Sequence, residues 1–165
     1  MKKLGNTTAT LVALVVTAAL AGPALAGFAA HSAVFSGSYT GTATEKVNGQ
    51  TVTAAARGKG TGTLVGKSTI TGTVVANTSD SPCALFGGPG VIAGAKGKLK
   101  VKILPTSRGC AASEEMRDNI SLAGTVKVTG GTAKFSKARG TLRFSGRYNR
   151  SSGAFTVKLK GTLRY

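Results

Sequence analysis

Tryptophan is absent from this chain of 165 residues, histidine occurs once and cysteine only twice. Zinc sites in proteins are built mainly from several His and Cys ligands. The single histidine, His31, lies near the N-terminus, in a stretch that we expect to be a flexible tail. The sequence therefore predicts neither a zinc site nor a Ser-His-Asp catalytic triad, which needs an anchored histidine.

Acidic residues are also scarce, with 5 Asp and Glu against 22 Lys and Arg. Three of the acids, Glu114, Glu115 and Asp118, lie close together, but they lack the ligand spacing of a calcium loop. The glycine-rich run at 87–90 is not followed by the Lys-Ser or Lys-Thr pair of a phosphate-binding loop. We therefore expect no bound metal and no cofactor, and no motif specifies a catalytic residue.

Only one long apolar run occurs, from Leu11 to Leu20. Lys2 and Lys3 precede it, and Ala24-Leu25-Ala26 follows it, which together form the three parts of an export signal. A membrane anchor is the alternative, but crossing a bilayer takes roughly 20 apolar residues. We expect residues 1–26 to be a removed signal peptide, so that the protein is secreted or lies in the cell envelope, with no transmembrane segment in the mature chain.

The remaining 139 residues suffice for one domain with a single core. We expect a flexible tail at 27–33 and a folded domain at 34–165. Both cysteines, Cys83 and Cys110, lie in this domain. An even pair in an exported protein indicates a disulfide; reactive thiols are the alternative.

Alternation of apolar and polar residues with a period of two recurs through this domain, and helical periodicity is nearly absent. The clearest example is Lys96 to Ile103, where four lysines alternate with Gly, Leu, Val and Ile. Strands are predicted at 34–44, 51–57, 60–65, 69–76, 96–103, 120–128, 142–148 and 155–163, with loops at 77–94 and 105–119 that the disulfide would join. Eight short strands predict an all-β fold, a single eight-stranded antiparallel up-and-down barrel, with a sandwich as the alternative.

A tripeptide of Gly, Thr and then Leu or Val occurs five times in these strands, beginning at Gly62, Gly72, Gly124, Gly140 and Gly161. Glycine weakens a strand unless the backbone must bend or pack closely. The repeat is therefore typical of the bends of a small barrel, although biased composition is an alternative.

Basic residues occupy the polar face of several predicted strands. The candidate polyanion-binding residues are Lys96, Lys98, Lys100, Lys102, Arg139, Arg143, Arg147, Lys158, Lys160 and Arg164. A surface of one sign attracts polyanions, whereas a surface that only keeps the protein soluble can mix both signs. We expect partners among anionic polymers or cell-envelope surfaces, and no sequence-specific reading of nucleic acid, because no helix is available for a groove.

The segment Gly130-Gly131-Thr132-Ala133-Lys134-Phe135-Ser136-Lys137-Ala138-Arg139-Gly140 resembles the Gly-Gly-Thr-Gly-x-Phe-x-x-Ala-x-Gly segment of dirigent proteins and allene oxide cyclases. The chain looks like a small secreted bacterial relative of these barrels, with Ala133 in place of a third glycine. The resemblance covers about 35 residues well. It implies an eight-stranded barrel whose lumen takes small hydrophobic molecules, but it places no catalytic residue in this chain.

Two classes of function remain. The first is a non-catalytic secreted barrel that binds anionic polymers and has room for a small hydrophobic ligand. The second is an allene oxide cyclase-like or dirigent-like enzyme that acts on a small hydrophobic substrate in the lumen. A lumen cavity above roughly 300 Å³ with inward polar groups would favour the enzyme, and a filled lumen would exclude it. No oligomer interface is evident in the sequence.

Overall fold

The computed structural model describes residues 31–78, 83–111, 113 and 117–165. The predicted signal peptide and residues 27–30 of the predicted tail lie outside the described residues. The first strand begins at Ser32, two residues before the predicted start of the domain. His31 lies beside the C-terminus, where its backbone N–H donates to the Tyr165 carbonyl (3.1 Å) and its carbonyl accepts from the Tyr165 N–H (3.0 Å).

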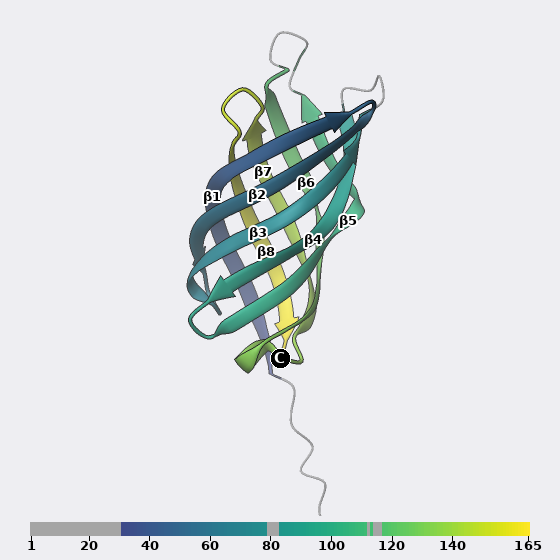
Figure 1. Cartoon of the computed structure of the whole chain (residues 1–165). Coiled ribbons are helices and arrows are strands. Elements are labelled where there is room, and N and C mark those ends of the chain that lie inside the picture. Colours follow the sequence, from purple (N-terminus) through teal and green to yellow (C-terminus); the bar gives the residue numbers. More distant parts are fainter. Residues whose placement is uncertain (1–30, 79–82, 112, 114–116) are drawn as a thin grey trace, which may run out of the picture.

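Eight antiparallel strands form a closed barrel, in which each strand pairs with its neighbours in the sequence and β1 pairs with β8 (Figure 1). This closure confirms the predicted fold class, and the described residues form no separate sheets that would make a sandwich. The elements are β1 (Ser32–Asn48), β2 (Thr51–Gly62), β3 (Gly66–Asn77), β4 (Cys83–Gly94), β5 (Gly97–Ala111), β6 (Asn119–Gly131), the 3-10 turn η1 (Ala133–Phe135), β7 (Arg139–Asn149) and β8 (Ala154–Arg164).

The predicted count of eight strands is right, but two of the predicted strands are one strand and one strand was missed. The strands expected at 51–57 and 60–65 form one strand, β2, and the loop expected at 77–94 contains β4. Gly60 lies inside β2, and the position requires glycine because a Cβ there would lie 1.9 Å from the Ser38 carbonyl oxygen. The two errors cancel in the total.

Strand β4 escaped prediction because both of its faces are apolar. Phe86 and Ile92 point into the barrel and are buried, while Leu85 and Pro89 are exposed on the outside. The sequence of β4 therefore shows no alternation of apolar and polar residues. Likewise, the loop predicted at 105–119 begins with the last part of β5, which continues past Pro105 to Ala111 beyond an irregular pairing with β6 between Ile103 and Arg108.

The predicted assignment of the apolar residues of β5 to the inside and of its lysines to the outside is confirmed. Leu99 and Val101 are 0% and 7% exposed, whereas Lys98, Lys100 and Lys102 are exposed on the outer face. One face of each strand therefore supplies the core and the other contacts solvent. The five glycines of the Gly-Thr repeat all lie where a side chain would clash, because a Cβ at each would come within 3.0 Å of another atom.

One end of the barrel is closed by a packed core and η1, near the C-terminus in Figure 1. Phe35, Leu142 and Leu163 are fully buried there, and Phe135 of η1 is fully buried beneath them. Thr132 and Phe135 start this turn with a backbone hydrogen bond of 3.0 Å. Ala133 adopts a φ of 50°, a conformation that usually requires glycine.

The predicted disulfide is present between Cys83 and Cys110, with an S–S distance of 2.03 Å. It does not join two loops. Cys83 and Cys110 face each other directly on the neighbouring strands β4 and β5, near the open end of the barrel. The bond therefore holds the two strand ends that continue beyond the register shift at Phe86 and Gly88.

Candidate functional site

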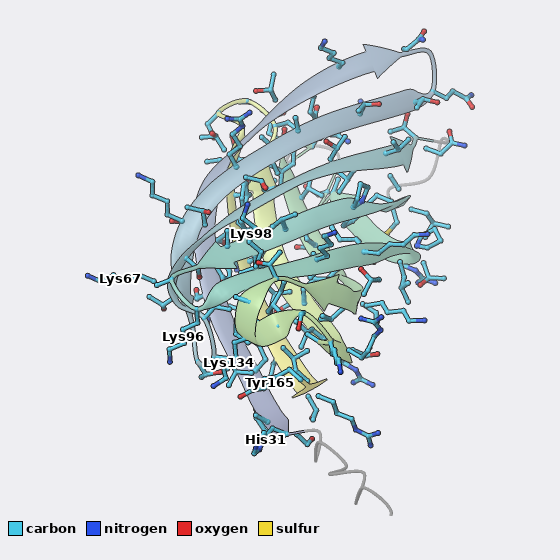
Figure 2. All side chains as sticks on the ribbon, turned by 60° about the horizontal axis from the view of Figure 1, so that its bottom comes forward. His31, Lys67, Lys96, Lys98, Lys134 and Tyr165 are labelled. Atoms are coloured by element: carbon cyan, nitrogen blue, oxygen red, sulfur yellow. A yellow bond between two sulfur atoms is a disulfide. The ribbon has the colours of Figure 1, made fainter. Side chains whose placement is uncertain are left out.

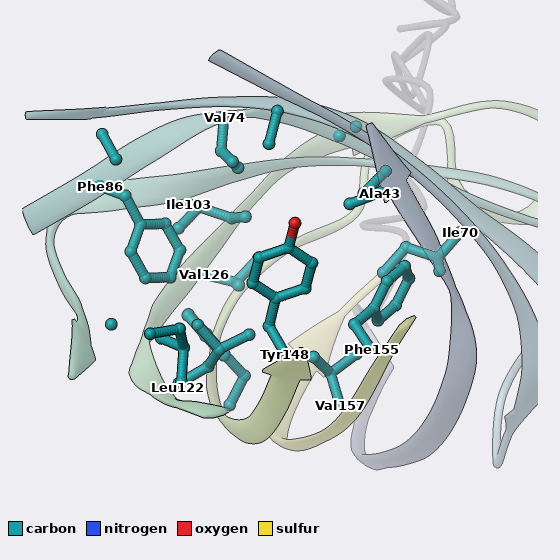
Figure 3. Close-up of a pocket in the computed structure, with 18 of the residues that line it drawn as sticks. Ala43, Ile70, Val74, Phe86, Ile103, Leu122, Val126, Tyr148, Phe155 and Val157 are labelled. Carbon is teal, nitrogen blue, oxygen red and sulfur yellow. The ribbon is translucent and has the colours of Figure 1, made fainter. Parts of the chain in front are cut away.

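The half of the barrel away from η1 contains a cavity of about 190 Å³. Aliphatic and aromatic side chains from all eight strands line it, and Figure 3 shows Phe86, Val126 and Phe155 around its centre. Ile103, Leu122 and Val157 are only partly buried because they face this space. The lumen is therefore neither filled nor as large as the 300 Å³ expected for an enzyme of the second class.

The ionisable side chains in the lining are Glu45, Tyr148 and Arg150. Glu45 lies in the last part of β1, Tyr148 near the end of β7 and Arg150 in the β7–β8 connection, so all three lie at the open end. The Tyr148 hydroxyl points across the cavity (Figure 3). Burial raises the pKa of Tyr148 to about 12, helped by the negative charge of Glu45 and by a hydrogen bond to its carboxylate, while Arg150 acts in the opposite direction.

This cluster was missed at the sequence level. Glu45 follows the inward parity of Tyr39, Gly41 and Ala43 along β1, and this parity was its only signal. The rest of the lining offers no acid or base deep in the lumen among the described residues. The cavity can therefore hold an apolar group, and polar chemistry is confined to its mouth.

All ten predicted polyanion-binding residues are exposed. Lys96 lies in the turn before β5, and the others project outward from β5, β7 and β8. At the closed end, Lys67 and Lys96 point away from the barrel (Figure 2). Arg139 also donates a hydrogen bond of 2.8 Å to the Ala138 carbonyl, which fixes its guanidinium beside the chain.

The strand pairing brings several of these cations directly opposite each other. Arg143 on β7 faces Lys160 on β8, and Arg139 faces Arg164. Lys158 faces Ser145, which lies between Arg143 and Arg147 in the sequence. Four of the predicted cations, Arg143, Arg147, Lys158 and Lys160, therefore lie on one surface of two adjacent strands.

Lys127 is a further cation that the sequence-based list omitted. It projects outward from β6 and faces Lys102 of β5 directly. Its place opposite the apolar parity of Val126 and Val128 was the available signal. Because β6 separates β5 from β7, Lys127 links the lysine row of β5 to the arginines of β7.

The opposite wall, formed by β1, β2 and β3, is different. Arg57 faces threonines on both sides, Thr42 and Thr71, and Lys59 faces Thr40 and Thr69. No cation there is directly opposite another in the described registers. The two acids in the described part of the chain, Glu45 and Asp118, both lie at the open end, and neither is in the strand pairings that contain the opposed cations.

No family model, no curated protein and no solved structure matches this chain. What defines the molecule is therefore its own geometry: a small closed barrel with an apolar lumen at one end and a cationic outer wall on one side. Among the described residues, no helix is long and apolar enough to cross a membrane, and no group of three or more His, Cys, Asp or Glu side chains is arranged to bind a metal.

Proposed function

We propose that this protein is a secreted, non-catalytic barrel that binds anionic polymers of the cell envelope or its surroundings through the outer wall of β5 to β8. The observation that carries the proposal is the set of three directly opposed cation pairs, Lys102 with Lys127, Arg143 with Lys160, and Arg139 with Arg164. Like charges directly opposite in a sheet destabilise it.

The cost of these pairs argues against a purely solubilising role. Alternating acids and bases would keep the surface soluble without self-repulsion, and the wall of β1 to β3 shows that this fold accepts threonine opposite a cation. A bound polyanion would neutralise the paired cations and release its own counterions, which favours binding.

The test is a titration of the purified protein with duplex DNA, used as a generic polyanion, at several salt concentrations. The affinity should fall steeply with salt, with a slope of log affinity against log salt of about −0.9 per phosphate contact. Replacing Arg143, Arg147, Lys158 and Lys160 with glutamine should reduce this slope by a few units and leave the fold intact, since all four are exposed.

The matched control replaces Lys46, Arg57, Lys59 and Lys67, which carry the same charge on the wall of β1 to β3, with glutamine. This variant should keep most of the original slope. If both variants lose the same amount, binding reflects net charge alone. If the original protein binds without salt dependence, the cationic wall serves only solubility.

A second candidate function uses the lumen. The apolar cavity of about 190 Å³ suits a small hydrophobic ligand or one segment of a larger one. The resemblance to dirigent proteins and allene oxide cyclases supports this candidate and its enzymatic alternative, for which Glu45 and Tyr148 at the mouth would be the groups able to transfer a proton.

The lumen candidate is tested with N-phenylnaphthylamine, a neutral probe that fluoresces in apolar surroundings. Ala76→Phe, in the lining, should abolish a saturable signal, whereas Thr73→Phe, on the exposed face of the same strand, should not. Equal signals from both variants would refute a lumen site. Conversion of a bound hydrophobic compound, lost in Glu45→Gln, would favour the enzyme.

A further inference from the structure

The cations of the outer wall form a continuous path across four strands. We define the cationic belt as Lys102 on β5, Lys127 on β6, Arg143 on β7 and Lys160 on β8. Lys102 faces Lys127, and Arg143 faces Lys160. Lys127 faces Thr141, two residues from Arg143, so the two pairs are joined by a diagonal step, which typically spans about 7 to 8 Å.

All four belt residues are exposed, and none of their side chains makes a hydrogen bond or ion pair with another described residue. Adjacent strands are about 4.8 Å apart, so each step along the belt brings the next charge within reach of one polymer chain. The belt therefore offers consecutive contacts to a single ligand that crosses the strands.

The belt is strongly curved. Strands β5 to β8 take up three of the eight interstrand steps of the closed barrel, so the belt follows more than a third of the circumference. Duplex DNA has a persistence length of about 50 nm and cannot bend around so small a body. A stiff rod can lie along β7 and β8, but it cannot also contact Lys102 and Lys127.

Resting on the proposed function, we infer that the ligand of the belt is a flexible linear polymer with one phosphate in each repeat and no bases, such as a poly(glycerol phosphate). Such a chain can follow the curve and pair with all four cations. Bases would add nothing, because no aromatic side chain projects from the outer wall of β5 to β8 in the described residues, and stacking on aromatics is how single strands are usually bound.

The experiment compares poly(glycerol phosphate) with a duplex DNA of equal phosphate number in salt titrations of the full protein and of Lys102→Gln/Lys127→Gln. Each contact with a single-stranded nucleic acid contributes about 0.7 units of slope, and we take the same value for the flexible polymer. For the flexible polymer, the double variant should therefore reduce the slope by about 1.4 units. For the duplex, the slope should be unchanged.

The control variant Lys59→Gln/Lys67→Gln removes the same charge from β2 and β3 and should change neither slope. If the belt variant keeps the full slope for both polymers, the polymer does not reach β5 and β6. If the variant loses the same amount of slope for both, binding reflects a diffuse electrostatic attraction. Either result overturns the belt. If the original protein binds neither polymer with salt dependence, the proposed function itself fails.

A third probe, oligo(dT) with the same number of phosphates, decides the chemical class. Affinity within a few-fold of that for poly(glycerol phosphate) is expected. Binding that is tighter by tenfold or more would show that bases are recognised and would overturn the assignment to a polymer without bases. The belt variant would then still report whether the strand follows the curve.

Discussion

Tyr148 lines the mouth of the lumen and contacts Glu45 there. Its hydroxyl reaches across the cavity and donates to the Glu45 carboxylate, which joins β7 to β1. Burial, the carboxylate charge and the hydrogen bond all favour the protonated phenol, so the pKa of Tyr148 rises to about 12. A tyrosine at this position is therefore a neutral hydrogen-bond donor throughout the ordinary pH range.

Glu45→Gln should lower the pKa of Tyr148 from about 12 without returning it to 10.0, because burial, the largest cause, remains. Ultraviolet titration of tyrosinate measures this, and Tyr148→Phe identifies the transition among the three tyrosines. Since the pKa is higher in the folded protein, the stabilisation is complete below pH 10 and is lost as the pH rises from about 10 to about 12. An unchanged transition in Glu45→Gln would contradict the contact.

At the scale of the elements, the strands owe their shape to glycines that admit a neighbouring backbone. Gly161 on β8 lies where a Cβ would be 2.2 Å from the Thr141 carbonyl oxygen and 2.9 Å from the Leu142 Cα. Neither atom can move without shifting β7. The Gly-Thr repeat is therefore a packing device and not a consequence of biased composition.

Gly161→Ala should lower the free energy of unfolding by about 1 to 3 kcal/mol, as overpacking of a close-fitting site does. Urea denaturation followed by circular dichroism measures it. Thr162→Ala, on the exposed face of the same strand, is the control and should change stability by less than about 0.5 kcal/mol. Equal effects of the two substitutions would mean that β7 and β8 can separate at no cost.

At the scale of the whole molecule, charge is distributed unevenly. The wall of β5 to β8 carries opposed cations, the wall of β1 to β3 carries isolated ones, and both described acids lie at the open end. Removing a cation from a pair should therefore stabilise the free protein, whereas removing an isolated cation should not. If removal of a paired cation stabilises the free protein, the pairs do not serve stability, and binding is the reason for them.

Arg143→Thr should raise the free energy of unfolding by about 0.2 to 1 kcal/mol at low salt, because it ends the repulsion from Lys160. The gain should shrink in 1 M salt, where the screening length falls to about 3 Å. Arg57→Thr, whose neighbours across the strands are threonines, is the matched control and should be neutral. Destabilisation by Arg143→Thr would show that the pair is not repulsive.

The sequence by itself determined the fold class, the disulfide partners and the outward direction of the cations. These follow from local rules: a period of two places Leu99 and Lys100 on opposite faces whatever the neighbouring strands are, and two cysteines allow one pairing. The same rules failed at β4, whose two faces are both apolar. They also failed near Gly60, where they predicted a break between two strands and the structure has one strand with a glycine at a close contact with β1.

Only the tertiary structure decided which residues meet. The register places Lys102 opposite Lys127 and Arg143 opposite Lys160, and closure of β1 on β8 places Glu45 near Tyr148, more than a hundred residues away. Alternation along a strand contains no information about the stagger between strands, which depends on turn lengths and on packing around the closed barrel. For the same reason, the volume of the lumen and the curvature of the cationic belt exist only in the closed barrel.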